Sequence, residues 1–284
     1  MILVVGGTGM LGRDLVSRFL SAGHRVRVLT RDRTRAAGLA TEVTVGDVLD
    51  PASLLEGVRG CDTVVAAMHG FLGGRRAGPE QVDETGTANL VAAAAAEGAP
   101  KFVLLSIAGA RADHPIGLFR AKYAAEQYLR ASALDWTIVR PSAYMQTWAG
   151  IVGAQLPDGP ATVFGRGKNP INFVAVDDVA AVVERAATDP TLSRMSVDAP
   201  GPQNLTMNQF AEHLGATRIR HIPRSALTVL ATAAKPIAPA FARQARTALV
   251  MDSLDMTADP AAAHARFPDL RWSRLAEILD TVNR

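Results

Sequence analysis

Apolar and polar positions follow two alternating patterns over the first half of the chain. Short, mostly apolar runs, typical of strands buried on both faces, separate longer stretches in which apolar residues recur every three or four positions, as in amphipathic helices. The predicted strands are residues 1–5, 24–30, 42–46, 62–67, 101–107 and 136–140. The predicted helices are residues 10–22, 51–57, 80–98 and 117–132. This alternation predicts an α/β fold with a Rossmann-like, doubly wound parallel sheet.

The pattern becomes irregular after Pro141. A strand, a helix, a second strand and a second helix are predicted at residues 171–176, 177–188, 194–198 and 206–214. We therefore expect a Rossmann-like domain at residues 1–150 and a mixed C-terminal region at residues 151–284, with a small substrate lobe and returning sheet elements. Substrate sites in open α/β sheets form at the carboxyl ends of the strands, where such a lobe would lie.

Three glycines join the first predicted strand to the first helix. Gly6, Gly9 and Gly12 fit the spacing GxxGxxG. In a dinucleotide-binding turn the first glycine permits a sharp bend, the second lets the backbone approach a pyrophosphate, and the third allows close packing of helix on sheet. The helix N-terminus adds free N–H groups for the phosphates. The turn residues expected to bind the cofactor are Gly6, Thr8, Gly9, Met10, Leu11 and Gly12.

The end of the second strand usually selects between the two nicotinamide dinucleotides, because an acid there accepts from the ribose 2′-OH of NAD. This chain instead has Thr30 and Arg31, followed by Arg33 and Arg35. A guanidinium can bind a 2′-phosphate through two parallel hydrogen bonds. We therefore expect NADP(H), with NAD(H) less favoured, and contacts from Arg31 and Arg35; a solvated basic turn is the alternative. Asp32 is expected to face outward or to cap the next helix.

The third and fourth strands also end in candidate cofactor residues. Asp47 lies where a carboxylate can accept a hydrogen bond from the adenine amino group, and small residues after the fourth strand would let pyrophosphate and ribose pass close. The set predicted here is Asp47, Val48, Ala66, Ala67 and Met68. His69 follows, as a proton carrier or as an ordinary loop residue.

Composition narrows the class of protein. A hydrophobic content of 48% with 20% charged residues indicates a folded chain with a sizeable core. The net charge is +3 with basic residues spread along the chain, which favours a small-molecule substrate over nucleic acid. Cys61 is the only cysteine, so we expect no disulfide and no metal site. The apolar residues 226–242 are interrupted by Lys235 and two prolines, and no signal peptide is evident. We expect a cytoplasmic protein without a membrane partner, either a monomer or a homodimer.

Six segments carry a family resemblance: residues 5–12, 28–32, 46–50, 86–90, 134–141 and 173–180. Together they resemble the atypical short-chain dehydrogenase/reductases, in particular the NmrA-like NAD(P)-binding proteins. The resemblance implies a Rossmann-like domain followed by a small C-terminal substrate region, in agreement with the pattern of apolar residues.

The resemblance also suggests catalytic residues. Short-chain dehydrogenases use Tyr-x-x-x-Lys, whose lysine binds the nicotinamide ribose and lowers the pKa of the tyrosine. Lys122 matches the lysine, whereas Leu118 stands at the tyrosine position. Ser106 lies near the family's serine, and Asp83 lies near its asparagine. Lys122 and Ser106 are therefore candidates for cofactor binding and for catalysis, and a purely structural role is the alternative for each.

In this family the segment after the sixth strand passes the nicotinamide. Pro141 is thus a candidate cofactor contact, Tyr144 a candidate catalytic residue and Gln146 a candidate substrate contact. Trp148 and Phe164 are expected either as apolar walls of the site or as core residues.

Two functions remain open. The first is an NADPH-dependent oxidoreductase of a small apolar carbonyl, quinone or unsaturated compound, which the lysine favours. The second is a non-catalytic NADP(H)-sensing regulatory protein of the NmrA type, which the missing tyrosine favours. The glycine-rich residues 71–78, with two arginines, form either a lid for an anionic substrate or a surface loop.

Overall fold

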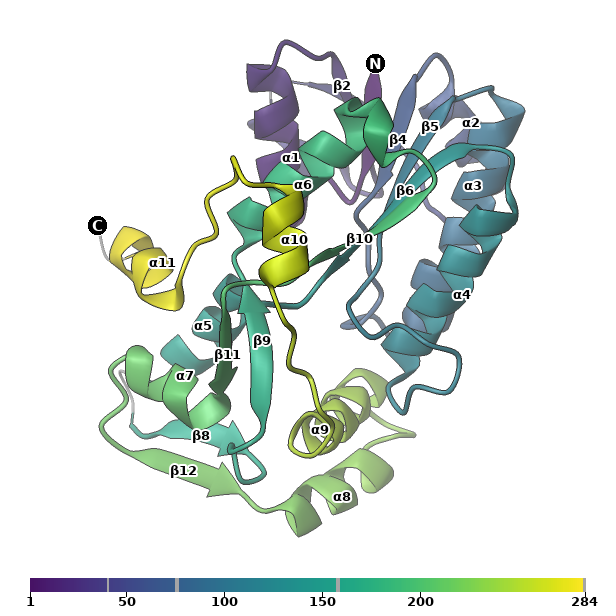
Figure 1. The fold of residues 1–284 in the computed structure, drawn as a ribbon. Helices are drawn as coiled ribbons and strands as arrows, with labels where there is room; N and C mark the ends of the chain where they lie inside the picture. The colour runs from purple at the N-terminus through teal and green to yellow at the C-terminus, as the bar shows by residue number, and fades with distance from the viewer. Residues whose placement is uncertain (40, 75–76, 157–158, 283–284) are drawn as a thin grey trace. The chain divides into compact units, whose positions relative to one another are not determined.

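The computed structural model describes residues 1–39, 41–74, 77–156 and 159–282 (Figure 1). The chain forms two compact units. The first unit consists of residues 1–140 and 179–198, and the second unit consists of residues 141–178 and 199–284.

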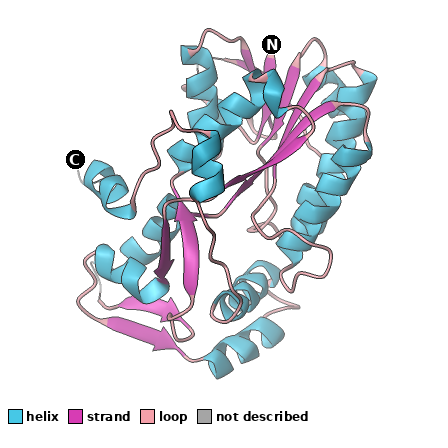
Figure 2. Ribbon diagram, viewed as in Figure 1, coloured by secondary structure: helices cyan, strands magenta, loops and turns pink. Residues whose placement is uncertain are grey.

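A seven-stranded sheet organises the first unit (Figure 2). Its strands are β1 (Ile2–Val5), β2 (Val26–Thr30), β3 (Glu42–Val45), β4 (Thr63–Ala66), β5 (Lys101–Leu105), β6 (Asp135–Pro141) and β10 (Met195–Ala199). Its helical segments are α1 (Met10–Ser21), η1 (Arg33–Ala36), α2 (Pro51–Val58), η2 (Glu80–Thr85), α3 (Gly86–Ala96), α4 (Gly117–Ala131), α6 (Val176–Thr188) and η4 (Pro190–Leu192). Helices α1 and α6 cover one face, and α2, α3 and α4 cover the other (Figure 1).

The strand order β10-β6-β5-β4-β1-β2-β3 is that of a doubly wound sheet. The pairings from β3 through β6 are all parallel. After β3 the chain crosses back to place β4 beside β1, so the direction of winding reverses between β1 and β4. Val5 aligns with Leu29 on one side and Ala66 on the other, so the carboxyl ends of these strands lie level. Such a switch point is where open α/β sheets bind their ligands.

The predicted fold class is confirmed, because the apolar runs are buried on both faces of the sheet. Every residue of β1, β4 and β5 is buried. The prediction of one continuous helix at residues 80–98 is wrong in detail: its first turn, η2, is a π-helix, and α3 follows it directly. The strand predicted at residues 101–107 ends at Leu105, which leaves Ser106 in the loop beyond the sheet.

The second unit contains two small sheets and several short helices. Its strands are β7 (Ala143–Tyr144), β8 (Ala161–Phe164), β9 (Pro170–Val174), β11 (Gln203–Thr206) and β12 (Ile219–Ile222). Its helices are α5 (Met145–Gly153), α7 (Met207–His213), α8 (Arg224–Ala233), α9 (Pro239–Met251), α10 (Ala261–Arg266) and α11 (Leu275–Val282). In the larger sheet, β9 pairs antiparallel with β11 and parallel with β7.

The second unit has its own apolar core. Phe173 of β9 packs against Phe210 of α7 with ring centroids 4.7 Å apart, and Met145, Leu205 and Leu275 surround them. Within the described ranges, every helix is too short or too polar to cross a bilayer.

Candidate cofactor and active site

The predicted glycine turn lies at the switch point between β1 and β4. Gly6 has φ +93°, and a Cβ on it would lie only 2.8 Å from the carbonyl oxygen of Ala67. A Cβ on Gly12 would overlap the carbonyl oxygen of Gly6. A Cβ on Gly9, in contrast, would meet only that carbonyl oxygen, at an ordinary 3.4 Å. The packing of the chain therefore requires glycine at positions 6 and 12, whereas at Gly9 the chain itself leaves the position open.

The first turn of α1 is available to an anion. Gly9 is its N-cap residue, no side chain caps the turn, and the turn contains no acid. Met10 is exposed and Leu11 is buried, so the chain passes from solvent into the core within this turn. Thr8, just before the cap, is partly buried. Uncapped N–H groups at a helix start favour negative charge.

Arginines gather beyond β2, in η1 and at the start of α1. Arg31 is exposed, and its side chain contacts no partner in the described part of the chain. Arg13 donates from Nη2 to the carbonyl oxygen of Arg35 at 2.6 Å, which ties η1 to the first turns of α1. The prediction that Asp32 caps the next helix is confirmed, because its Oδ1 accepts from the N–H of Thr34 at 2.9 Å. Arg13 was not among the predicted site residues, although its position in the first turn of the helix would have indicated a cation close to the predicted phosphate site.

The residues after β3 and β4 are held by the chain itself. Asp47 accepts from the N–H of Leu49 at 3.0 Å and is partly buried. Val48 is buried, and its carbonyl oxygen accepts from Asn89 at 3.0 Å. Ala66 is fully buried and Ala67 donates to the carbonyl oxygen of Val5 at 2.8 Å, so the ends of β1 and β4 are fastened together.

Lys122 is buried on α4 and joins three segments of the first unit. Its Nζ donates to the carbonyl oxygen of Leu105 at 2.7 Å and to that of Met68 at 3.1 Å. It also forms an ion pair with Oδ1 of Asp83 at 2.9 Å, in an orientation unlike that of an aligned hydrogen bond. Asp83 lies in the π-helical turn η2, is fully buried, and accepts from the N–H of Gly70 through Oδ2 at 2.8 Å. The ammonium group thus has three protein partners: two carbonyl oxygens that accept hydrogen bonds and one carboxylate that pairs with its charge.

A second buried cluster lies one turn along α4. Ser106 donates to Oε1 of Glu126 at 2.5 Å, and Arg140 binds both oxygens of the same carboxylate, at 2.8 and 2.5 Å. Glu126 is fully buried. Neither Glu126 nor Arg140 was predicted as a site residue; the available signal was the spacing of four residues from Lys122 to Glu126, which places both on one helix face. The hydroxyl proton of Ser106 therefore points at a carboxylate, and its catalytic role stays a prediction.

Two histidines lie in the loops beyond β4 and β5. Desolvation lowers the pKa of His69, although the side chain reaches solvent; the charge of Lys122 lowers it further and that of Asp83 opposes the effect. His114 is buried and stacks on Phe119 with centroids 4.0 Å apart. Its Nδ1 accepts from the N–H of Ile116 at 3.1 Å, and desolvation lowers its pKa.

The residues predicted to follow the sixth strand belong to the second unit, and the first of them, Pro141, is the last residue of β6. Pro141 is buried. Tyr144 of β7 is partly buried, and desolvation raises the pKa of its phenol well above the ordinary range. Gln146 accepts from the N–H of Val176 through Oε1 at 2.9 Å, so its amide supports the start of α6. The structure gives Gln146 a structural contact, while its role toward a substrate stays a prediction.

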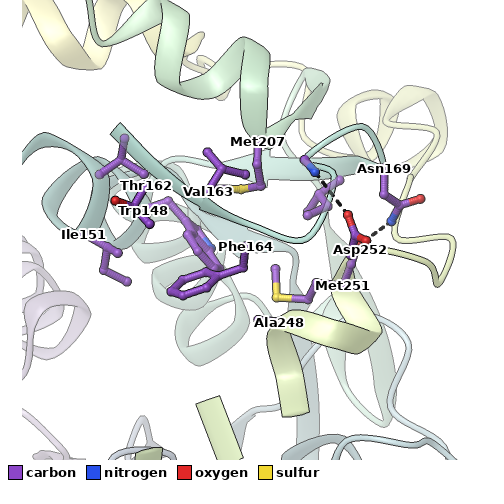
Figure 3. Close-up of a pocket in the computed structure, with 13 residues that line it drawn as sticks. Trp148, Ile151, Thr162, Val163, Phe164, Asn169, Met207, Ala248, Met251 and Asp252 are labelled. Atoms are coloured by element: carbon purple, nitrogen blue, oxygen red, sulfur yellow. Dashed lines mark hydrogen bonds between the residues drawn. The ribbon is translucent and has the colours of Figure 1, made fainter. Parts of the chain in front are cut away.

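A small, mainly apolar pocket lies within the second unit (Figure 3). Trp148 and Phe164, predicted as apolar walls or core residues, both line it, and Met207 and Met251 are among its other apolar lining residues. Asp252 is its buried charge: Oδ1 accepts from the N–H groups of Arg166 and Gly167, and Oδ2 accepts from Arg224 at 2.7 Å.

The loop predicted at residues 71–78 is described only in part. Arg75 and Arg76 lie outside the described residues. Leu72 is 65% exposed, and Gly73 donates to the carbonyl oxygen of Gly70 at 2.9 Å in a tight turn. The lid and the surface loop both stay predictions.

Comparison with known proteins identifies the family. Residues 6–190 match the family model described as NAD(P)H-binding. An NAD(P)H azoreductase from Xenophilus azovorans is 30% identical over 233 residues, covering 81% of this chain and 78% of the relative. The photosystem II assembly factor Ycf39 from Synechocystis sp. is 30% identical over 239 residues, covering 80% and 72%.

Solved structures share the fold. The Escherichia coli NADPH-dependent quinone oxidoreductase QOR2, complexed with NADPH, superposes with a TM-score of 0.81 over the full length of both chains at 18% identity. At this identity the likeness concerns the fold alone. The family match and the azoreductase relative carry the classification: the chain belongs to the NAD(P)H-binding family and is an NAD(P)H-dependent oxidoreductase.

Proposed function

We propose that this protein is an NADPH-dependent reductase of small, largely apolar carbonyl compounds, quinones or other unsaturated compounds, in the NmrA-like branch of the atypical short-chain dehydrogenase/reductases. The observation that carries the proposal is the turn between β1 and α1. Gly9 leaves space that no side chain of the turn fills, directly before an uncapped helix start. A pyrophosphate fits both features.

Arg31 supports NADPH over NADH. It is exposed beyond β2, where an acid would select NAD, and its guanidinium has no partner in the described segments. Arg13 and Arg35 add positive charge nearby through the contact between α1 and η1. A 2′-phosphate would gain charge-assisted hydrogen bonds here, whereas a 2′-hydroxyl would leave the charge uncompensated.

The chemistry that NADPH supplies when bound is hydride transfer. We assign Lys122 to positioning: it holds the carbonyl groups of Met68 and Leu105, at the ends of β4 and β5, where the nicotinamide ribose is expected. Ser106 and Tyr144 remain candidates for delivering a proton. Desolvation raises the pKa of Tyr144, which makes its phenol a weaker acid and suits it to donating a hydrogen bond more than to giving up its proton. The bond from Ser106 to Glu126 would have to open before Ser106 could donate elsewhere.

The pocket of the second unit supports an apolar substrate. Trp148, Phe164 and two methionines offer aromatic and polarizable surface, which suits planar unsaturated rings. The azoreductase and quinone oxidoreductase to which the chain is similar carry substrates of this type in their names.

Steady-state oxidation of NADPH and of NADH tests the proposal. The acceptors are a benzoquinone, a naphthoquinone, an azo dye and an aliphatic aldehyde. Each acceptor is assayed with the unaltered protein, with the variant Trp148→Ser and with the matched control Trp148→Phe. We expect turnover of at least one aromatic acceptor with NADPH. Trp148→Ser should raise KM for that acceptor about 5- to 30-fold, the scale of one lost aromatic contact, while KM for NADPH stays constant.

One result would contradict the proposal, and a second would remove only the pocket from it. NADPH binding without turnover of any acceptor would favour the NADP(H)-sensing regulator instead. Turnover with an unchanged KM in Trp148→Ser would remove the pocket from the substrate site but leave the reductase assignment intact.

A further inference from the structure

Helices α8 and α9 form a hairpin that exposes apolar side chains at one end. Four large apolar residues, here called the hairpin tip, are exposed: Val229 by 65%, Leu230 by 36%, Ile237 by 87% and Phe241 by 46%. Single exposed apolar residues are common, but a group of four large ones in a short segment indicates a binding surface.

The local geometry gathers these residues. Val229 and Leu230 belong to the last turns of α8, Ile237 lies in the connection, and Phe241 lies in the first turn of α9. The two helices pack along their length, so the bend brings both ends together (Figure 1). Leu227 is buried in the hairpin and so does not contribute to the exposed surface. The four exposed side chains therefore lie at the same end of the hairpin, and the second unit leaves them uncovered.

The charge of this segment is one-sided. Between Glu212 and Asp252 the chain has no acidic residue, although it has 27 in total, and the same interval holds six of its 30 lysines and arginines. Basic residues are spread along the whole chain, but within this interval the sequence itself contains no acid beside them. Arg224 is paired with Asp252. Lys235 and Arg246 are exposed, and their side chains have no partner among the residues whose structure is described.

We propose that the hairpin binds the surface of an anionic lipid bilayer. Apolar side chains flanked by unbalanced lysine and arginine are the two requirements for interfacial binding: the apolar groups enter the boundary between headgroups and acyl chains, and the cations contact lipid phosphates. Nucleic acid would match the charge but not an isoleucine exposed by 87%. The hairpin lies on the membrane and does not span it, because Lys235 and two prolines interrupt it.

Vesicle sedimentation tests this surface with the full-length protein. We expect it to sediment with vesicles of equal parts phosphatidylcholine and phosphatidylglycerol, weakly with pure phosphatidylcholine, and less at high salt because the charges are screened. Ile237→Asn should lower the partition coefficient at least about tenfold, since a four-carbon apolar side chain that would enter the lipid is replaced by a polar amide. Lys235→Glu should lower it roughly 5- to 25-fold on the anionic vesicles.

Matched controls remove an exposed side chain elsewhere. Tyr128→Ser takes away an aromatic residue that is 50% exposed on α4, and Arg25→Glu reverses a surface charge in the first unit. Both should sediment like the unaltered protein, and NADPH binding should persist in all four variants. Failure of the unaltered protein to bind anionic vesicles overturns the proposal. So does a self-associated form that Ile237→Asn dissociates without any effect on lipid binding, because the tip would then be a contact between copies.

Discussion

Replacing Lys122 by methionine should destabilise the first unit strongly. The ammonium group and its partner Asp83 are both buried, so the substitution leaves a carboxylate in the interior with the N–H of Gly70 as its remaining neutral partner. Breaking a buried ion pair by removing one member costs about 3–5 kcal/mol. The carbonyl oxygens of Met68 and Leu105 also lose a donor. Because the free energy of unfolding of a whole protein is roughly 5–15 kcal/mol, this single substitution would remove a large part of the stability.

A second substitution, Asp83→Asn, separates the contribution of the ion pair from that of the hydrogen bonds that Lys122 donates to Met68 and Leu105. An asparagine at position 83 can still accept from the N–H of Gly70 but carries no charge. We therefore expect the double variant with Lys122→Met to recover at least about 2 kcal/mol relative to Lys122→Met alone. Urea unfolding of the parent, both single variants and the double variant measures this coupling energy.

Activity then distinguishes positioning from chemistry. If Lys122 only holds the strand ends, the double variant should fold and retain turnover within about tenfold of the parent. If its charge acts on the reacting groups, the double variant should fold but lose on the order of 100-fold in kcat. Additive free energies in the double-mutant cycle would refute the reasoning, because the two side chains would then not share the interaction seen between them.

Three further predictions concern the same unit. Arg31→Asp should weaken NADPH binding by about 1–3 kcal/mol and leave NADH binding nearly unchanged by calorimetry; equal affinity of the unaltered protein for the two cofactors contradicts it. Gly9→Val should abolish NADPH binding in a folded protein, whereas Gly12→Val should lower the melting temperature because its side chain overlaps the backbone of the turn. Since burial lowers the pKa of His114 below 6.5, the unfolded chain takes up the proton first, so stability is complete above that pH and falls as the pH drops toward the folded pKa. His114→Asn, which keeps an acceptor for the N–H of Ile116, should flatten that fall in melts between pH 7.5 and 5.

The parts of the fold that sequence predicts well are those determined locally. A glycine at position 6 is needed for a positive φ, and one at position 12 for contact with backbone six residues away, so both requirements are visible in a short window. The buried strands are likewise predicted by short runs of apolar residues in the sequence. The π-helical turn η2 is different: its sequence continues the helical pattern of α3, and nothing local marks the change that buries Asp83.

The buried charges depend on distant partners and were therefore harder to predict. Lys122 contacts Met68, 54 positions earlier, and Glu126 meets Arg140 on a neighbouring strand. The second unit shows the same limit in its strands. The pairing of β12 with β8 joins Ile219 to Ala161, and strands this short carry too few residues for a period to emerge.

Two features distinguish this chain from the Tyr-x-x-x-Lys pattern of the short-chain dehydrogenases that it resembles. Leu118 stands where that pattern has its tyrosine, and Asp83 places a negative charge against Lys122. Without a tyrosine on α4, a free positive charge on Lys122 has no phenol pKa to lower. Burying that ammonium group without a charged partner would also be costly. Reduction of a quinone or an aryl azo bond suits such a site better than reduction of an aliphatic ketone. The negative charge that hydride transfer leaves on these acceptors is delocalised over an aromatic system, whereas the charge on an alkoxide oxygen is localised and needs a positioned acid or hydrogen-bond donor to stabilise it as it develops. The proposed acceptors thus follow from what α4 has lost as well as from the aromatic pocket of the second unit.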